Sequence, residues 1–109
     1  MKLPNGDRAV VEMAKLLGYC LSLSHPRGRN KARVFAAVGI REKDAEALRI
    51  SLLEAAKNGE ARHGEPSPYG NRYVVDFEME HEGRRISIRS SWIIQGADGA
   101  PRLTSCYVL

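Results

Sequence analysis

The stretch Arg72–Ile94, RYVVDFEMEHEGRRISIRSSWII, decides the fold because apolar and polar residues alternate along it. The alternation runs over residues 72–80 and again over residues 85–94. A period of two residues indicates strands with one buried face and one exposed face. Glu82-Gly83 stands between the two runs and suits a two-residue turn. The segment therefore predicts an antiparallel hairpin.

A turn at this place also predicts which residues face each other across the hairpin. On one face the pairs are apolar: Tyr73 with Trp92, Phe77 with Ile88, and Met79 with Ile86. On the other face acids meet arginines: Asp76 with Arg89, and Glu80 with Arg85. Opposite charges directly across a strand pair are favourable, so pattern and register agree. Trp92 falls on the apolar face, which favours a core position over a base-stacking one.

Before the hairpin, apolar residues recur with the period of an α-helix. This spacing predicts about three helices, over Glu12–Leu21, about Arg29–Val38, and Glu42–Asn58. The short apolar run 9–11 suits either an edge strand or the entry to the first helix. Asn58-Gly59 is a stop signal for the third helix.

After the hairpin, residues 102–108 predict a third strand, and its facing stays open. Leu103 and Tyr107 favour one parity, whereas Cys106 and Val108 favour the other. Residues 62–70 are expected to form a loop. The fold class predicted for residues 1–109 is thus a single α+β domain with N-terminal helices (about three) followed by an antiparallel β-meander of three to four strands.

Composition narrows the classes of function and location. Cys20 and Cys106 form no CxxC pair, which favours two reduced thiols, and the three histidines lack the spacing of zinc ligands. No phosphate-loop, dinucleotide or metalloprotease motif is present. No segment resembles a signal peptide or a membrane span. We therefore expect a cytoplasmic protein with no metal, no cofactor and no membrane partner.

Charge is distributed unevenly along the chain, whose net charge is +4. No acid occurs between Glu12 and Glu42, and the region that follows, up to Glu82, is rich in acids. A basic surface is the usual footprint of RNA or another phosphate-bearing polyanion. The acidic region alternatively suits a basic protein partner or a second copy of the chain. A mildly skewed, ordinary surface explains the pattern as well.

The segment Ser24–Arg33, SHPRGRNKAR, is the densest candidate site. If a helix starts near Arg29, its first amides lack acceptors within the helix and, with the cations around them, favour an anion. His25 is the one nearby group that titrates near neutrality, and it suits proton transfer beside a phosphate. Lys31 suits stabilisation of charge on the phosphoryl group. The expected nucleic-acid-binding residues are Arg27, Arg29, Arg33, Ser91 and Arg102.

Arginine and hydroxyl residues on the predicted sheet form a second candidate group. Arg89, Thr104 and Tyr107 suit the lining of a phosphate cleft, together with Ser91 and Arg102. For Arg89 a structural role as the partner of Asp76 is equally open.

Several segments together resemble a family of small bacterial domains without an assigned function, which occur alone and as tails of secreted polymorphic toxins. They are His25–Gly28, Lys31–Phe35, Arg89–Trp92 and Pro101–Val108. That family is similar in turn to the barnase, EndoU, colicin D and RelE-like ribonuclease toxins. The resemblance implies N-terminal helices, an antiparallel sheet and RNA cleavage without a metal.

The resemblance also implies roles for single residues. His25 becomes the acid or base and Lys31 the phosphate ligand, with Arg89, Thr104 and Tyr107 as further catalytic residues and Ser91 in support. The sequence thus leads to the hypothesis of a toxin-like, metal-independent endoribonuclease with a small antitoxin-like protein partner. A non-catalytic RNA- or protein-binding module, or an antitoxin-like role for the acidic region, is the alternative.

Overall fold

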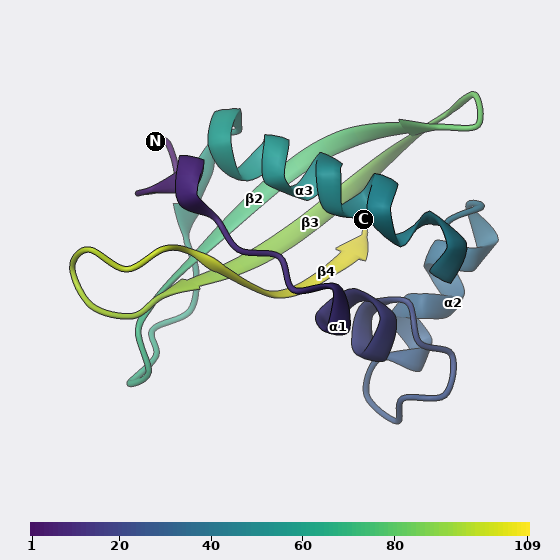
Figure 1. Ribbon diagram of the computed structural model, residues 1–109, viewed down its shortest axis with the longest axis horizontal. Helices are drawn as coiled ribbons and strands as arrows, with labels where there is room; N and C mark the ends of the chain where they lie inside the picture. The colour runs from purple at the N-terminus through teal and green to yellow at the C-terminus, as the bar shows by residue number, and fades with distance from the viewer.

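The computed structural model describes residues 1–109 and has three α-helices followed by a four-stranded antiparallel sheet (Figure 1). This confirms the predicted α+β class. The elements in chain order are η1 (Gly6–Arg8), α1 (Met13–Lys15), η2 (Leu16–Cys20), α2 (Arg29–Ala37), η3 (Glu42–Asp44), α3 (Ala45–Asn58), β1 (Ala61–His63), β2 (Asn71–His81), β3 (Arg84–Ile94) and β4 (Arg102–Val108).

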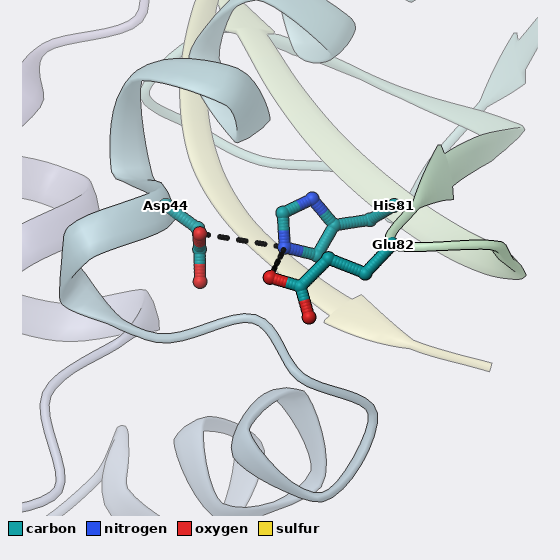
Figure 2. A group of neighbouring side chains, drawn as sticks. All are labelled: Asp44, His81 and Glu82. Atoms are coloured by element: carbon teal, nitrogen blue, oxygen red, sulfur yellow. Dashed lines mark ion pairs between the residues drawn. The ribbon is translucent and has the colours of Figure 1, made fainter.

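The hairpin of β2 and β3 has the predicted register. Tyr73 pairs with Trp92 and Asp76 with Arg89, so every pair expected from the alternation is present. Glu82 and Gly83 both have positive φ, 51° and 79°, as a tight turn matched to the strand twist requires. The tip of the hairpin lies beside the start of α3, where the side chains of His81 and Asp44 approach each other (Figure 2).

The sheet is a simple meander of order β1-β2-β3-β4, which leaves β1 and β4 at its edges. Figure 1 shows α3 along β2 and β3, whereas α1 and α2 lie beside β4. The core forms between the helices and the alternating inward residues of the strands, with Phe35, Leu48, Ile88 and Trp92 fully buried. No helix of the structure has the length and apolar character that crossing a bilayer requires.

The first helix is found where it was predicted, but its second half is widened. After α1, residues Leu16–Cys20 form a π-helical turn, closed by a bond from the Leu21 amide to the Leu16 carbonyl at 2.8 Å. Leu16 and Cys20 point into the core and are fully buried. π-helical turns are rare and occur mostly as single widened turns within an α-helix. Here the turn packs against α2 and β4.

Two short segments pair differently from what the sequence patterns predict. Residues 62–70 were expected to form a loop, but Arg62 and His63 belong to β1, which pairs with residues 73–75 of β2. A strand of three residues is too short to show a period, so its partner strand defines it. The run 9–11 contributes a single bridge, between Val10 and Arg102.

The facing of β4, which the sequence left open, is decided by a β-bulge. Ser91 pairs with Ser105 and the next residue, Trp92, pairs with Leu103, so Thr104 is the extra residue. Because the extra residue reverses the alternation, Leu103 and Cys106 both face the core. Each of the two alternation patterns therefore holds on one side of the bulge: Leu103 faces the core before it, and Cys106 faces the core after it.

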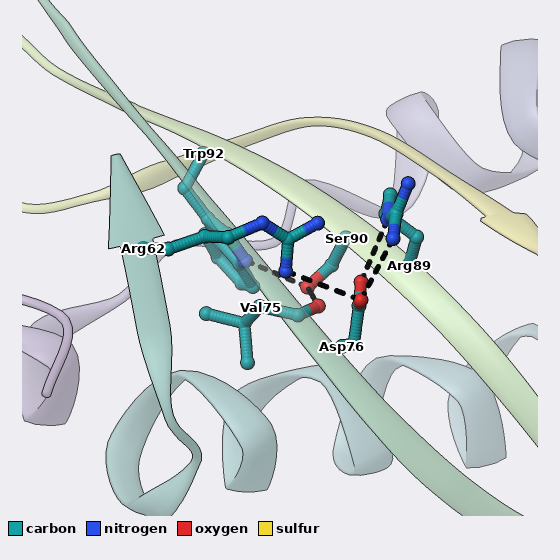
Figure 3. Close-up of polar contacts among 6 residues, drawn as sticks. All are labelled: Arg62, Val75, Asp76, Arg89, Ser90 and Trp92. Atoms are coloured by element: carbon teal, nitrogen blue, oxygen red, sulfur yellow. Dashed lines mark hydrogen bonds and ion pairs between the residues drawn. The ribbon is translucent and has the colours of Figure 1, made fainter. Parts of the chain in front are cut away.

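A buried hydroxyl joins the two central strands (Figure 3). Ser90 is fully buried; its Oγ accepts a hydrogen bond from Trp92 Nε1 at 2.9 Å and donates one to the Val75 carbonyl at 2.7 Å. Without Ser90 the indole N–H has no partner in the core, and a buried unpaired donor is costly.

We expect Ser90→Ala to lower the free energy of unfolding by about 1 to 3 kcal/mol, because it strands the Trp92 N–H. Urea denaturation followed by tryptophan fluorescence measures the loss. Ser87→Ala on the exposed face of the same strand is the control, with an expected change below about 0.5 kcal/mol. Equal losses in the two variants would contradict the role given to Ser90.

Candidate functional site

His25 lies just before α2, and its ring caps the turn of residues 26–28 that leads into the helix. The Nδ1 atom accepts hydrogen bonds from the backbone amides of Arg27 at 3.0 Å and Gly28 at 3.1 Å. Gly28 is required here because a Cβ would collide with the Tyr19 carbonyl, so α2 starts directly against η2. The local sequence thus brings the imidazole of His25 to the junction of the two helices.

This cap determines what the imidazole offers to a ligand. With Nδ1 used as an acceptor, the hydrogen of the neutral ring sits on Nε2. His25 therefore presents a hydrogen-bond donor, and Nε2 has no lone pair for accepting a proton. The ring suits an anion such as a phosphate oxygen better than it suits a hydroxyl that must be deprotonated.

The start of α2 is only in part the open anion site expected from the sequence. The Arg29 amide is already bonded to the His25 carbonyl at 2.9 Å. The amides of Asn30 and Lys31 have no acceptor in the chain. Only two amides of the first helical turn are therefore free to bind an anion.

Tyr19, on η2, joins His25 to two lysines. Its ring lies edge-on to the His25 ring, with centroids 4.9 Å apart and planes at 88°. Lys15 Nζ lies 5.6 Å and Lys31 Nζ 6.0 Å from the Tyr19 ring centroid. Cations at such distances are attracted to the face of an aromatic ring. The two predicted residues His25 and Lys31 thus border one aromatic ring.

Lys31 also connects α2 to the edge strand β4. Its Nζ donates to Ser105 Oγ at 3.2 Å and lies 5.1 Å from the centroid of the Tyr107 ring. Tyr107 is the register partner of Arg89 on the neighbouring strand. The structure therefore links four of the five predicted catalytic residues in one row. We call His25, Tyr19, Lys15, Lys31, Ser105 and Tyr107 the edge cluster.

Arg89 continues this row but is held by an acid (Figure 3). Its Nε and Nη2 donate to the two carboxylate oxygens of Asp76 at 2.8 and 2.9 Å, and Arg62 Nη1 adds a contact of 3.2 Å. The bond to Asp76, and next the neighbouring hydroxyl of Tyr107, raise the pKa of Arg89 above its ordinary value. The bond from Arg89 lowers the pKa of Asp76. Arg89 thus has the structural partner that the register predicted.

The remaining predicted residues are more dispersed. Thr104 Oγ1 donates to the Ser91 carbonyl at 3.1 Å, which ties both residues to the bulge. Arg102 pairs with Glu12 at 2.7 Å. Arg27, Arg29 and Arg33 are exposed and make no side-chain hydrogen bond or ion pair, so they are free to meet a polyanion. These side chains form the outer part of the basic surface.

A surface pocket of about 340 Å³ adjoins the edge cluster. It lies between the first helix and the start of β4, and its polar lining comes from Glu12, Lys15, Tyr19 and Arg102. The pocket brings Arg102 close to Lys15 and Tyr19, which the linear sequence does not suggest.

Behind the edge cluster the two cysteines are buried against each other. A hydrogen bond from Cys106 lowers the pKa of Cys20, against the effect of burial, and Lys15 and Lys31 act in the same direction. The hydrogen bond to Cys20, together with burial, raises the pKa of Cys106. Because both thiols are fully buried, they support the cluster from within and do not face a macromolecular ligand.

Sequence reasoning missed Lys15, Tyr19 and Ser105. Lys15 and Tyr19 are four residues apart on one helix face, a spacing that was available as a signal. Ser105 carried no signal, because its direction depends on the bulge.

The fold and the edge cluster define a small α+β domain with a basic, tyrosine-containing site at one sheet edge. The chain belongs to the family described as "Domain of unknown function (DUF6883)", whose model matches residues 2–109. No curated protein and no solved structure matches the chain.

We expect Asp76→Asn to lower the urea midpoint at pH 7, because it removes the carboxylate that Arg89 and Arg62 contact. The pKa of Asp76 is lowered on folding, so its contribution is complete above the unfolded value of about 3.9 and is lost as pH falls through the lower folded value. The midpoints of parent and variant are therefore expected to converge in strong acid. Glu80→Gln, which loses only an exposed pair, is the control. A gap between parent and Asp76→Asn that is independent of pH would contradict this assignment.

Proposed function

We propose that this protein is a metal-independent endoribonuclease of the toxin type, acting through the edge cluster. The observation that carries the proposal is the position of Lys31, whose ammonium lies between Ser105, Tyr107 and the ring of Tyr19. A cation held by several elements is suited to a phosphate, because it needs no rearrangement when charge develops.

In the proposed reaction the ribose 2′-oxygen attacks the adjacent phosphorus and the bond to the 5′-oxygen breaks. The products are a 2′,3′-cyclic phosphate and a 5′-hydroxyl, and the proton lost by the 2′-hydroxyl is balanced by one gained at the 5′-oxygen. Lys31 and the Nε2–H of His25 contact the phosphoryl oxygens. The Tyr107 hydroxyl, beside Lys31, accepts the proton of the 2′-hydroxyl as it gives its own proton to the leaving 5′-oxygen.

Two further features support an RNA substrate. Tyr19 and Tyr107 offer rings on which bases can stack, and Arg27, Arg29 and Arg33 surround the site with free cations. The order of helices followed by an antiparallel meander agrees with the ribonuclease toxins that the sequence resembles, although fold order alone is an analogy. We propose a small, acidic, antitoxin-like protein as the partner that covers this basic surface.

We expect the purified protein to cut single-stranded RNA in the presence of EDTA. Lys31→Met is expected to lower the rate by about 100-fold or more, because it removes the charge that stabilises the pentacovalent phosphate. Gel electrophoresis follows cleavage, and phosphorus NMR identifies the cyclic phosphate.

Three further variants sharpen this test. Tyr107→Phe removes only the phenol. His25→Asn keeps an oxygen acceptor for the capped amides and withdraws the imidazole, so it separates catalysis from capping. Lys57→Ala, on the exposed side of α3, is the matched control for loss of a lysine. Absence of cleavage by the parent, or equal rates for the parent and Lys31→Met, would refute the proposal.

A second candidate function is RNA binding without cleavage. Two contacts favour it: the Nδ1 cap, which leaves His25 as a donor, and the bidentate pair that occupies Arg89. In this case the edge cluster holds a phosphate, and Tyr107 does not take up the proton of the 2′-hydroxyl.

For either function we expect RNA affinity to fall with salt. The double variant Arg27→Ala/Arg29→Ala is expected to weaken binding and to reduce the slope of log K against log salt by roughly 1 to 2. Fluorescence anisotropy of a labelled RNA at several salt concentrations measures both quantities. Retention of RNA that is independent of salt and of these arginines would exclude this surface.

A further inference from the structure

A second cluster of chemically active side chains lies where the β2–β3 hairpin meets the start of α3 (Figure 2). Asp44, His81 and Glu82 each bring one ligand atom there, and these atoms all lie within 4.8 Å of one another. Asp44 closes η3, His81 ends β2, and Glu82 forms the turn. Asp44 is far in sequence from the adjacent residues His81 and Glu82, so no motif spacing predicts this group.

The imidazole of His81 has no hydrogen-bond partner at Nε2, although that atom is shielded from solvent. Figure 2 shows this corner of the ring turned toward both carboxylates. Nε2 lies 3.3 Å from Asp44 Oδ1 and 3.5 Å from Glu82 Oε1, yet neither contact has hydrogen-bond geometry. A buried nitrogen that faces two acceptors without bonding to either is a polar atom whose partner is missing.

The two spacings from His81 Nε2 to the carboxylate oxygens agree with tetrahedral coordination, and the oxygens lie within 4.8 Å of each other. Zn²⁺ binds histidine nitrogen and carboxylate oxygen at about 2.0 to 2.1 Å, which places neighbouring ligand atoms about 3.3 to 3.4 Å apart. The contacts from Nε2 are close to this value. Histidine with two carboxylates is also a donor set that suits a divalent transition metal.

Two of the three ligands are already fixed. Asp44 Oδ2 accepts a hydrogen bond from the Arg41 amide at 3.0 Å, and this bond is the main cause that lowers the pKa of Asp44. Asp44 is therefore ionised and oriented, as an outer-shell contact orients a metal ligand. The side chain of His81 is only 14% exposed and that of Asp44 only 10%, whereas Glu82 is 62% exposed and free to close over an ion.

A cation already occupies the neighbourhood of these oxygens. Lys43 Nζ lies 3.6 Å from Asp44 Oδ1 and 3.7 Å from Glu82 Oε1, the same two atoms that approach His81. The Lys43 side chain is 67% exposed and can rotate away into solvent. The ammonium thus balances the acids when no ion is present and competes with one that arrives.

We propose that Asp44, His81 and Glu82 bind a divalent transition-metal ion of the Zn²⁺ class, with water completing a tetrahedral site. The ion joins the tip of the hairpin to the start of α3, two segments that otherwise meet through side chains alone. This is a structural site, and it is separate from the edge cluster and from any RNA cleavage. Its ligands are ionised carboxylates and a neutral imidazole.

The test is titration of the full chain with Co²⁺ alone and with Zn²⁺ alone. We expect the visible d–d absorption of tetrahedral Co²⁺ in the parent, displacement of that signal by Zn²⁺, and a higher melting temperature with Zn²⁺. Lys43→Met is expected to bind about tenfold more tightly, because it removes a competing charge beside the site.

The ligand variants decide the assignment. His81→Ala and Glu82→Gln are expected to lose both the absorption band and the thermal shift, and Glu82→Gln does so without removing a buried group. His63→Ala and Glu80→Gln are the matched controls and keep both signals. Absence of the band in the parent, or equal binding by Glu82→Gln and the parent, would overturn the proposal. RNA cleavage in EDTA is a separate measurement, so the two proposals stand or fall independently.

Discussion

The register of the β2–β3 hairpin is the constraint on which the rest of this molecule depends. Because side chains alternate along a strand, a slip of one residue would move Trp92 and Ile88 to solvent and bring Asp76 and Arg89 into the core. Three independent terms oppose such a slip: the left-handed turn at Glu82-Gly83, the apolar pairs, and the Asp76–Arg89 pair. The two faces of the sheet, and therefore the separation of core from site, follow from this one alignment.

The bulge in β4 determines which residues of the edge strand face the core and which face α2. Because Thr104 is an extra residue in the strand, Leu103 on one side of it and Cys106 on the other both face the core. Beyond the bulge, Ser105 and Tyr107 are left in contact with Lys31 of α2. A regular strand would satisfy only one half of the core pattern. The bulge thus allows both halves of the strand to pack against the core, and it also positions Ser105 and Tyr107 of the edge cluster. Bulges are common beside active sites, where they redirect side chains.

Local patterns were sufficient for most of the fold, because hairpin register and helix periodicity arise within short windows. They failed where a partner decides the outcome: β1 exists through its pairing with β2, and the π-helical turn of η2 exists through its packing against α2 and β4. The same division applies to the site. His25 and Lys31 stood out by residue type, whereas Tyr19 and Ser105 became visible only once the chain was folded. The Asp44–His81–Glu82 group also became visible only in the folded chain, because folding brings Asp44 to the adjacent residues His81 and Glu82.

The cap at α2 limits what chemistry the edge cluster can perform. The imidazole of His25 is held in place because its Nδ1 accepts hydrogen bonds from two backbone amides. As a result, Nε2 carries the hydrogen of the neutral ring and cannot accept a proton. Lys31 is a donor as well, and Ser105 and Tyr107 carry hydroxyls. The cluster is therefore rich in groups that stabilise negative charge and poor in groups that remove a proton. In the proposed cleavage, a phosphate ester held there would gain most from stabilisation of the pentacovalent state, and the proton of the attacking hydroxyl would leave through Tyr107 or through water. The proposed catalysis would thus rest on electrostatic complementarity more than on a strong base.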